Sequence, residues 1–251
     1  MDLKTQENGT NRTSALIIAT ISSFLSSFMG SSINIALPEI EKTFSMNAIT
    51  LSWVATAYLL SVAAFLVPFG KLADIYGRKK IYTIGVAAYT LSSVLCAIAF
   101  SDISMIVFRV LQGISSAMIF STSMAILTSV FSDGERGKAF GISVSATYLG
   151  LSLGPFIGGI MTKHLGWESI FWVNLPIGVF LLYLVTKLLK GEWAEAQNEK
   201  FDYVGSLILS VSLIALMIGM SHLPMFAGFA LIFGGLAGLV IFVYHQTHIH
   251  N

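Results

Sequence analysis

One arginine of this chain lies inside a long apolar run. Arg109 follows Ile-Val-Phe, and Gln112, Ser115 and Ser116 come within the next two turns of a helix. An arginine in the middle of a membrane costs at least about 2.5–3.5 kcal/mol, so its side chain is expected to face a polar cavity or a partner. The alternative is that the guanidinium, about 9 Å from the expected helix end at 1.5 Å per residue, snorkels to the membrane surface.

A second group of charges stands in a short connection between two apolar runs. The string reads Gly70-Lys-Leu-Ala-Asp-Ile-Tyr-Gly-Arg-Lys-Lys80. Gly70 and Gly77 permit close backbone approach or a positive φ. Asp74 is a single acceptor among four cations, the last three of which are Arg78, Lys79 and Lys80, and charge-assisted bonds to it would hold a tight turn. The alternative is a merely basic surface loop.

Small residues recur along a further apolar run. Ala146, Gly150, Gly154 and Gly158 stand four residues apart, with Gly159 beside them. This spacing predicts one smooth helix face that another helix can approach closely. Pro155 removes a backbone donor and is expected to bend the helix. Such a face suits either movement against a neighbour or static packing.

The first apolar run carries hydroxyl and amide groups at intervals that place them on one side of a helix. These include Ser27, Ser31 and Asn34. Polar side chains of this kind either join helices by hydrogen bonds or line a cavity. The sequence leaves these two alternatives open.

Other chemistry is excluded by what the chain lacks. Cys96 is the only cysteine, so no disulfide within the chain and no multi-cysteine metal site can form. The three histidines near the C-terminus are interpreted as a cytosolic tail and not as a metal site. There is no phosphate-binding loop and no nucleophile with a base, so no enzyme site is expected. A net charge of +1 does not favour a nucleic-acid partner.

The elements that position these residues follow from composition. The 251 residues are 55% hydrophobic and 11% charged, which is far too apolar for a soluble domain. Eight runs are long enough to cross a bilayer as helices. Their ranges are 14–36, 49–69, 81–101, 103–127, 139–161, 169–186, 203–221 and 225–244. The sequence therefore predicts an all-α integral membrane protein.

The loop cations predict the orientation of these helices. With the N-terminus in the cytosol, eleven lysines and arginines fall in cytosolic segments and two, Lys42 and Lys163, in outer loops. Both termini are then cytosolic. The predicted parts are a cytosolic N-terminus (1–13), a six-helix bundle (14–186), a solvated cytosolic linker (187–202), two further membrane helices (203–244) and a cytosolic tail (245–251).

Five ordered motifs together resemble the major facilitator superfamily, and among its members the fourteen-helix drug:proton antiporters. The 70–80 loop is similar to the signature between helices 2 and 3. Arg109-Val-Leu-Gln-Gly113 resembles the helix 4 motif, and Gly150 to Gly159 the antiporter motif of helix 5. Asn34-Ile-Ala-Leu-Pro38, at the predicted end of helix 1, and Gly166 to Gly178, at the opening of helix 6, resemble signatures of the fourteen-helix branch.

The resemblance implies an N-terminal bundle of two inverted three-helix repeats, followed by two additional helices. It implies export of drugs or other amphipathic compounds across the cell membrane, driven by a proton gradient without a cofactor. Arg109 and Gln112 would belong to a proton relay, and Gly70, Asp74, Gly77, Arg78 and Lys79 to a cytoplasmic gate. Expected partners are lipid, a small-molecule substrate, protons, and a C-terminal six-helix half or a second copy.

Two departures from the family pattern leave alternatives open. Met29 stands where many relatives place an aspartate, and no carboxylate lies deep in a predicted helix. The second six-helix bundle is also missing from the sequence. The alternatives are a metabolite transporter, or a non-transporting subunit or truncated product derived from such a transporter.

Overall fold

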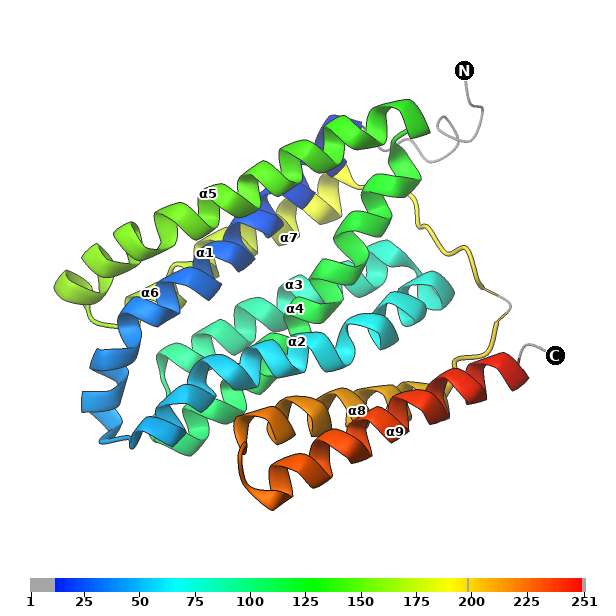
Figure 1. Cartoon of the computed structure of the whole chain (residues 1–251). Coiled ribbons are helices and arrows are strands. Elements are labelled where there is room, and N and C mark those ends of the chain that lie inside the picture. The colour runs from blue at the N-terminus through cyan, green and yellow to red at the C-terminus, as the bar shows by residue number, and fades with distance from the viewer. Residues whose placement is uncertain (1–11, 198, 250–251) are drawn as a thin grey trace.

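The computed structural model describes residues 12–197 and 199–249, and those residues form a bundle of long helices (Figure 1). Eight of its segments are long and apolar enough to cross a membrane, which confirms the eight predicted spans. The helices are α1 (Arg12–Phe44), α2 (Ala48–Tyr76), α3 (Arg78–Ala97), α4 (Asp102–Val130), α5 (Asp133–Leu165), α6 (Ser169–Trp172), α7 (Asn174–Leu188), α8 (Tyr203–Ser221) and α9 (Phe226–Ile249).

Local signals account for the starts of some helices. Asn47 caps α2 by accepting a hydrogen bond from the N–H of Thr50 at 2.9 Å. Ser101 and Ser104 form a capping box at the start of α4, so α3 ends at Ala97 and not at the predicted residue 101. Side-chain oxygens at these positions satisfy N–H groups that the first helical turn leaves unpaired.

Two further predicted spans differ from the structure at a proline. The first was expected to end at residue 36 with Pro38 after it, but α1 continues through Pro38 to Phe44. Ile40 is fully buried in this extension, and its burial favours a continued helix despite the missing donor of the proline. The sixth span is interrupted after Trp172, because Pro176 cannot donate to the carbonyl four residues before it.

The packing order of the first six spans reflects an internal repeat. Helix α1 packs along α5, and α2 packs along α4. In the predicted inverted repeat, spans 1, 2 and 3 correspond to spans 4, 5 and 6. The α1–α5 pair then corresponds to the α4–α2 pair, and both pairs are packed in the structure. The α8–α9 hairpin packs on α2 at the edge of this bundle.

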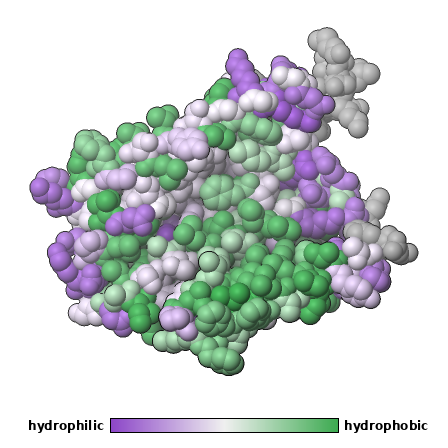
Figure 2. Space-filling view, viewed as in Figure 1, coloured by the Kyte–Doolittle hydropathy of each residue, from purple (hydrophilic) through white to green (hydrophobic). Residues whose placement is uncertain are grey.

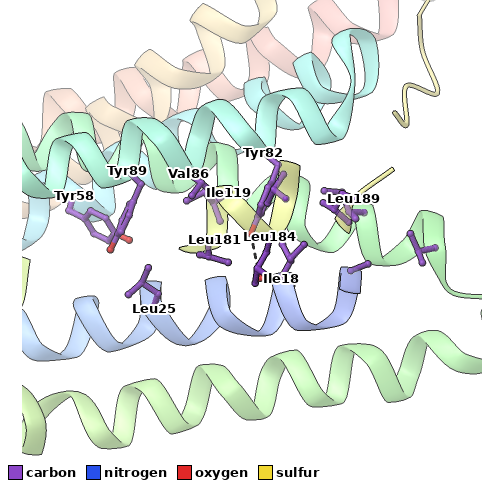
Figure 3. Packing of buried hydrophobic residues seen from close by; sticks show 14 residues of the cluster. Ile18, Leu25, Tyr58, Tyr82, Val86, Tyr89, Ile119, Leu181, Leu184 and Leu189 are labelled. Carbon is purple, nitrogen blue, oxygen red and sulfur yellow. Dashed lines mark hydrogen bonds between the residues drawn. The ribbon is translucent and has the colours of Figure 1, made fainter. Parts of the chain in front are cut away.

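Two buried clusters fill the bundle, one toward each end. Figure 3 shows side chains of α1, α2, α3, α4 and α7 that meet in the first cluster, with Tyr82 donating to the carbonyl of Ile18 at 3.4 Å. The second cluster contains Met29, Phe171 and Trp167. In Figure 2, hydrophobic residues cover the α8–α9 side and hydrophilic residues gather at the two ends, as expected for helices that stand in a bilayer.

Charged residues at one end of the bundle surround the connection from α2 to α3. We call this end the linker end, because the segment from α7 to α8 also crosses it (Figure 1). The ion pair between Arg12 and Glu135 (2.6 Å) lies between the starts of α1 and α5. The other end carries the pair of Lys42 with Glu39 at 2.8 Å.

Candidate functional site

The 70–80 segment was predicted as a connection after a helix that ends at residue 69, but most of it is helical: α2 continues to Tyr76, α3 begins at Arg78, and Gly77 alone lies between them. We keep the name 70–80 turn for this segment. Gly77 has φ of +112° and is at once the C-cap of α2 and the N-cap of α3, so only glycine takes this position without strain. Its N–H donates to the carbonyl of Ala73 at 2.9 Å. At Gly70 an added Cβ would meet Ser121 at an ordinary 3.7 Å, so the expected close approach is required at Gly77 and not at Gly70.

Arg78 is the centre of the charges in this turn. The residue is 7% exposed. Its Nε donates to Asp74 at 2.9 Å, and Nη2 forms an ion pair with the same carboxylate oxygen at 2.8 Å. The guanidinium also donates to Ser129 of α4 at 2.6 Å. Lys79 instead reaches the carbonyl of Leu189 at 2.5 Å. The predicted bond between Asp74 and a cation is therefore present, and Arg78 is the cation that makes it.

Arg109 lies in the interior of the bundle and is 1% exposed. Its Nε donates to the carbonyl of Val54 at 2.8 Å, and another nitrogen donates to Oε1 of Gln112 at 2.5 Å. The guanidinium also stands 4.4 Å from the ring centre of Tyr58. These contacts place it against protein partners, and the snorkelling alternative is wrong.

The partners of Arg109 belong to a longer polar chain. Gln112 donates onward to Ser93 of α3 at 2.8 Å, and Tyr58 is joined to Ser116 at 2.9 Å. The hydroxyl of Tyr89 is buried and has no protein partner. Among the residues that the structure describes, the hydrogen-bond partners of the guanidinium are a carbonyl and an amide oxygen and not a carboxylate. A charge in this setting is stabilised by carbonyl and amide dipoles and by the face of an aromatic ring.

The small-residue face of α5 packs directly on α1. A Cβ at Gly150 would lie 2.5 Å from the carbonyl oxygen of Phe24. At Gly154 and Gly158 it would lie 2.7 Å from the Cβ atoms of Ser31 and Ser32. Helices can approach this closely only where a residue has no Cβ, so these positions require glycine. The predicted close approach of two helices is thus observed, and its partner helix is α1.

Pro155 and Gly159 stand next to this face and not on it. Pro155 is exposed, and α5 continues as a helix on both sides of it. A Cβ at Gly159 would meet Ile35 at an ordinary 3.5 Å. Only three of the five residues of the predicted motif therefore depend on close contact with α1.

The polar side chains of α1 join helices in most cases. Ser31 donates to the carbonyl of Leu151 at 2.8 Å, and Ser32 to that of Gly154 at 3.0 Å. Ser27 is buried beside Gly150. Asn34 is exposed and bonds to the carbonyl of Gly30 in its own helix at 3.3 Å. The structure favours helix joining for Ser31, as for its neighbour Ser32. A cavity-lining role stays a prediction for Ser27 and Asn34.

Several residues that complete the site have no signal in the sequence. Tyr58 and Ser93 are ordinary members of apolar helices, and Ser32 is adjacent to the serine that the spacing selected. The acidic residues of the 187–202 linker were interpreted as solvated, yet Glu192 and Glu195 contact the 70–80 turn.

Between residues 12 and 249, omitting 198, no three His, Cys, Asp or Glu side chains gather closely enough to hold a metal ion. His250 of the tail lies outside the described residues.

Comparison with known sequences identifies relatives over most of this chain. The profile of the Major Facilitator Superfamily matches residues 19–250. The riboflavin transporter RibZ of Clostridioides difficile is 35% identical over 91% of this chain and 49% of its own length. The multidrug resistance protein Stp of Mycobacterium tuberculosis is 36% identical over 82% of this chain and 39% of its own length. The cephamycin export protein CmcT of Amycolatopsis lactamdurans is 33% identical over 84% of this chain and 44% of its own length.

The chain thus spans about half the length, or less, of these curated relatives. Solved transporter structures resemble it in fold. The human organic anion transporter MFSD10 has a TM-score of 0.64 at 19% identity, covering 82% of this chain and 55% of that protein. A peptide transporter, POT, in complex with sulfate has a TM-score of 0.67 at 14% identity, covering 83% of this chain and 51% of that protein. At these identities the likeness concerns the fold alone, and it agrees with the predicted fold class.

Proposed function

Because the chain belongs to the Major Facilitator Superfamily, we propose that it is the N-terminal portion of an exporter of drugs or other amphipathic organic compounds, driven by protons. The observation that carries the direction and the substrate class is its similarity to proteins named for drug resistance and for antibiotic export. Each of them matches more than four fifths of this chain.

In this proposal Arg109 and Gln112 take part in the proton relay. An arginine stays charged at neutral pH, so its contribution is to hold a positive charge and to change partners. Its bonds to Val54 and Gln112 use separate nitrogens, which allows one bond to open while the other stays. The group that gains and loses the proton is a carboxylate elsewhere in the complete transporter. The energy source is the proton gradient, and no cofactor takes part.

The 70–80 turn forms the cytoplasmic gate of the proposed transporter. Orientation follows the positive-inside rule, since the linker end carries most of the loop cations. Both chain termini would then face the cytosol, in a protein of the cell membrane. Asp74 holds Arg78 in place at this gate.

A complete transport pathway requires a second bundle, since alternating access in this architecture rests on two bundles that move about a central site. We propose that a C-terminal six-helix half or a second copy of this chain supplies it. The face of α5 away from α1 exposes large apolar side chains such as Tyr148 (65%) and Phe156 (68%). This face is available to a second bundle as well as to lipid.

A second candidate is transport of a metabolite. Its support is the similarity to a riboflavin transporter over 91% of this chain. A third alternative is a membrane subunit that does not transport.

The test is uptake into inside-out membrane vesicles that contain this chain and are energised by a proton gradient. Ethidium accumulation that a protonophore abolishes supports export of cationic drugs, and riboflavin accumulation supports the second candidate. Absence of both, with and without an added C-terminal bundle, would favour the non-transporting alternative.

A matched pair of variants tests the gate. Asp74→Asn should abolish export without affecting membrane insertion, because the neutral amide loses the charge-assisted bonds to Arg78. Glu41→Gln makes the same chemical change at an exposed position of the opposite end, and it should export like the unmodified chain. Equal export by the two variants would contradict the gate role of Asp74.

A further inference from the structure

The segment that follows α7 lies on the 70–80 turn along most of its length. We propose that residues 189–197 and 199, which we call the strap, position the gate turn and connect it to the α8–α9 hairpin, with Glu192 as the main positioning residue. This inference rests on the proposed function only where it concerns transport. The attachment of the strap is a property of the structure itself.

Two hydrophobic anchors fix the strap at its beginning. Leu189 is 1% exposed within the first buried cluster, and Trp193 packs against the same cluster. Their burial holds the backbone between them close to the start of α3. A fully solvated linker would not place one large apolar side chain in a buried cluster and a second one against it within five residues.

Glu192, between the anchors, supplies a helix cap that the turn lacks. The N-cap of α3 is Gly77, which has no side chain to accept a hydrogen bond. The carboxylate of Glu192 accepts from the N–H of Lys79 at 2.7 Å and from the N–H of Lys80 at 3.1 Å. A negative charge at this place also interacts favourably with the helix dipole. The cap of α3 thus comes from a residue more than a hundred positions later in the chain.

Gly77 has a second role in this arrangement. A Cβ at that position would collide with the side chain of Glu192. The glycine therefore permits the left-handed backbone of the turn and also leaves the space that the carboxyl group occupies. The positive φ of Gly77 and its missing Cβ both permit the contact with Glu192.

Backbone bonds continue the strap along the turn. The N–H of Arg78 donates to the carbonyl of Trp193 at 2.8 Å, and the N–H of Ala196 donates to the carbonyl of Asp74 at 2.9 Å. These bonds pair the main chain of the strap with the two residues that form the central ion pair. Movement of the turn therefore moves the strap as well.

Two further glutamates contact the cations of the turn. Glu195 pairs with Arg78 at 2.8 Å, and Glu199 pairs with Lys71. Both glutamates are more than half exposed, and pairs with such an exposed partner contribute little to stability, but they align the strap along α2. Three residues later Asp202 caps α8, so the turn and the hairpin are joined by a short, attached segment.

Hydrogen exchange of the full chain in detergent or nanodiscs tests the attachment. In the unmodified chain the amides of Arg78 and Ala196 should exchange slowly, and exchange at the rate of an unfolded peptide at both would overturn the proposal. Glu192→Ala should accelerate exchange in the first turn of α3 roughly fivefold, the ratio for a lost helix cap. Glu195→Ala, which removes a side-chain pair and no cap, should leave that turn unchanged. Equal exchange in the two variants would also overturn it.

Transport provides an independent readout. Glu192→Ala should lower the maximal export rate without changing KM, and Glu192→Asp should restore part of it. A changed KM with an unchanged maximal rate would contradict a positioning role. If the unmodified chain transports nothing, the exchange data still decide whether the strap is attached, so the two failures are distinguishable.

Discussion

Gly150→Ala tests the close contact between α1 and α5 with the smallest change available. The added methyl group would stand 2.5 Å from the carbonyl oxygen of Phe24 and 2.9 Å from the amide nitrogen of Phe28. Both are backbone atoms, so no side-chain rotation can relieve the collision. The two helices must instead separate by roughly 1 Å to reach ordinary contact distances.

The expected cost follows from this separation. Overpacking of a well-packed interface costs about 1–3 kcal/mol, and a gap of this size also removes part of the attraction along the neighbouring residues. Alanine is the better helix former by about 1 kcal/mol, which offsets part of that cost. Gly159→Ala has the same helix gain, but its methyl group would meet Ile35 at 3.5 Å. We expect Gly150→Ala to be destabilising and Gly159→Ala to be neutral or stabilising.

Cys96 provides the assay. It is the only cysteine of the chain and is fully buried, so a thiol-reactive fluorophore reports unfolding on heating in detergent. Each kcal/mol shifts the midpoint by about 2–4 °C in a chain of this size. Equal midpoints for Gly150→Ala and Gly159→Ala would refute the contact between the two helix backbones, since the substitutions differ only in what the methyl group meets.

Three further outcomes are expected. Arg109→Lys should lower proton-coupled export about tenfold or more, since the lysine lacks the fork that contacts two partners at once; unchanged drug-driven proton release would contradict the relay. In a Cys96→Ala background, Tyr76→Cys and Leu165→Cys should react with an impermeant reagent from opposite sides of the membrane, and labelling of both from outside would exclude the proposed orientation. Asp202→Ala should destabilise the α8–α9 hairpin by about 1 kcal/mol through loss of its cap, measured by hydrogen exchange of α8 at neutral pH. Partial burial raises the pKa of Asp202, but the bonds from the Gly205 N–H, His245 and Gln246 outweigh it and lower that pKa overall. The cap therefore contributes fully above the ordinary carboxyl pKa of about 3.9. It loses this contribution as the pH falls through the lowered pKa.

The amino-acid sequence alone determined the membrane-spanning architecture. Eight apolar runs predicted eight spans, because each helix must satisfy its own backbone in lipid and the signal is therefore local. The four-residue spacing of Gly150, Gly154 and Gly158 predicted a smooth face, because this signal also lies within a single helix. The bond between Asp74 and a cation of the 70–80 turn could also be predicted, since Asp74 and Arg78 are four positions apart in the sequence.

Helix ends were less well determined. The first span was predicted to end at residue 36, and burial of Ile40 favours the longer helix that continues through Pro38. A proline removes one hydrogen bond, and tertiary contacts that the local sequence does not display can offset that loss.

Only the tertiary structure decided which groups meet across the bundle. Arg109 could have reached the membrane surface or a partner, and the carbonyl of Val54, 55 positions earlier, settled this. The linker had the composition of a solvated segment, yet Glu192 caps a helix 113 positions before it. Contacts of this kind depend on how helices pack and on where the bundle leaves a donor or a carbonyl unpaired, and neither quantity is contained in the spacing of residues along one helix.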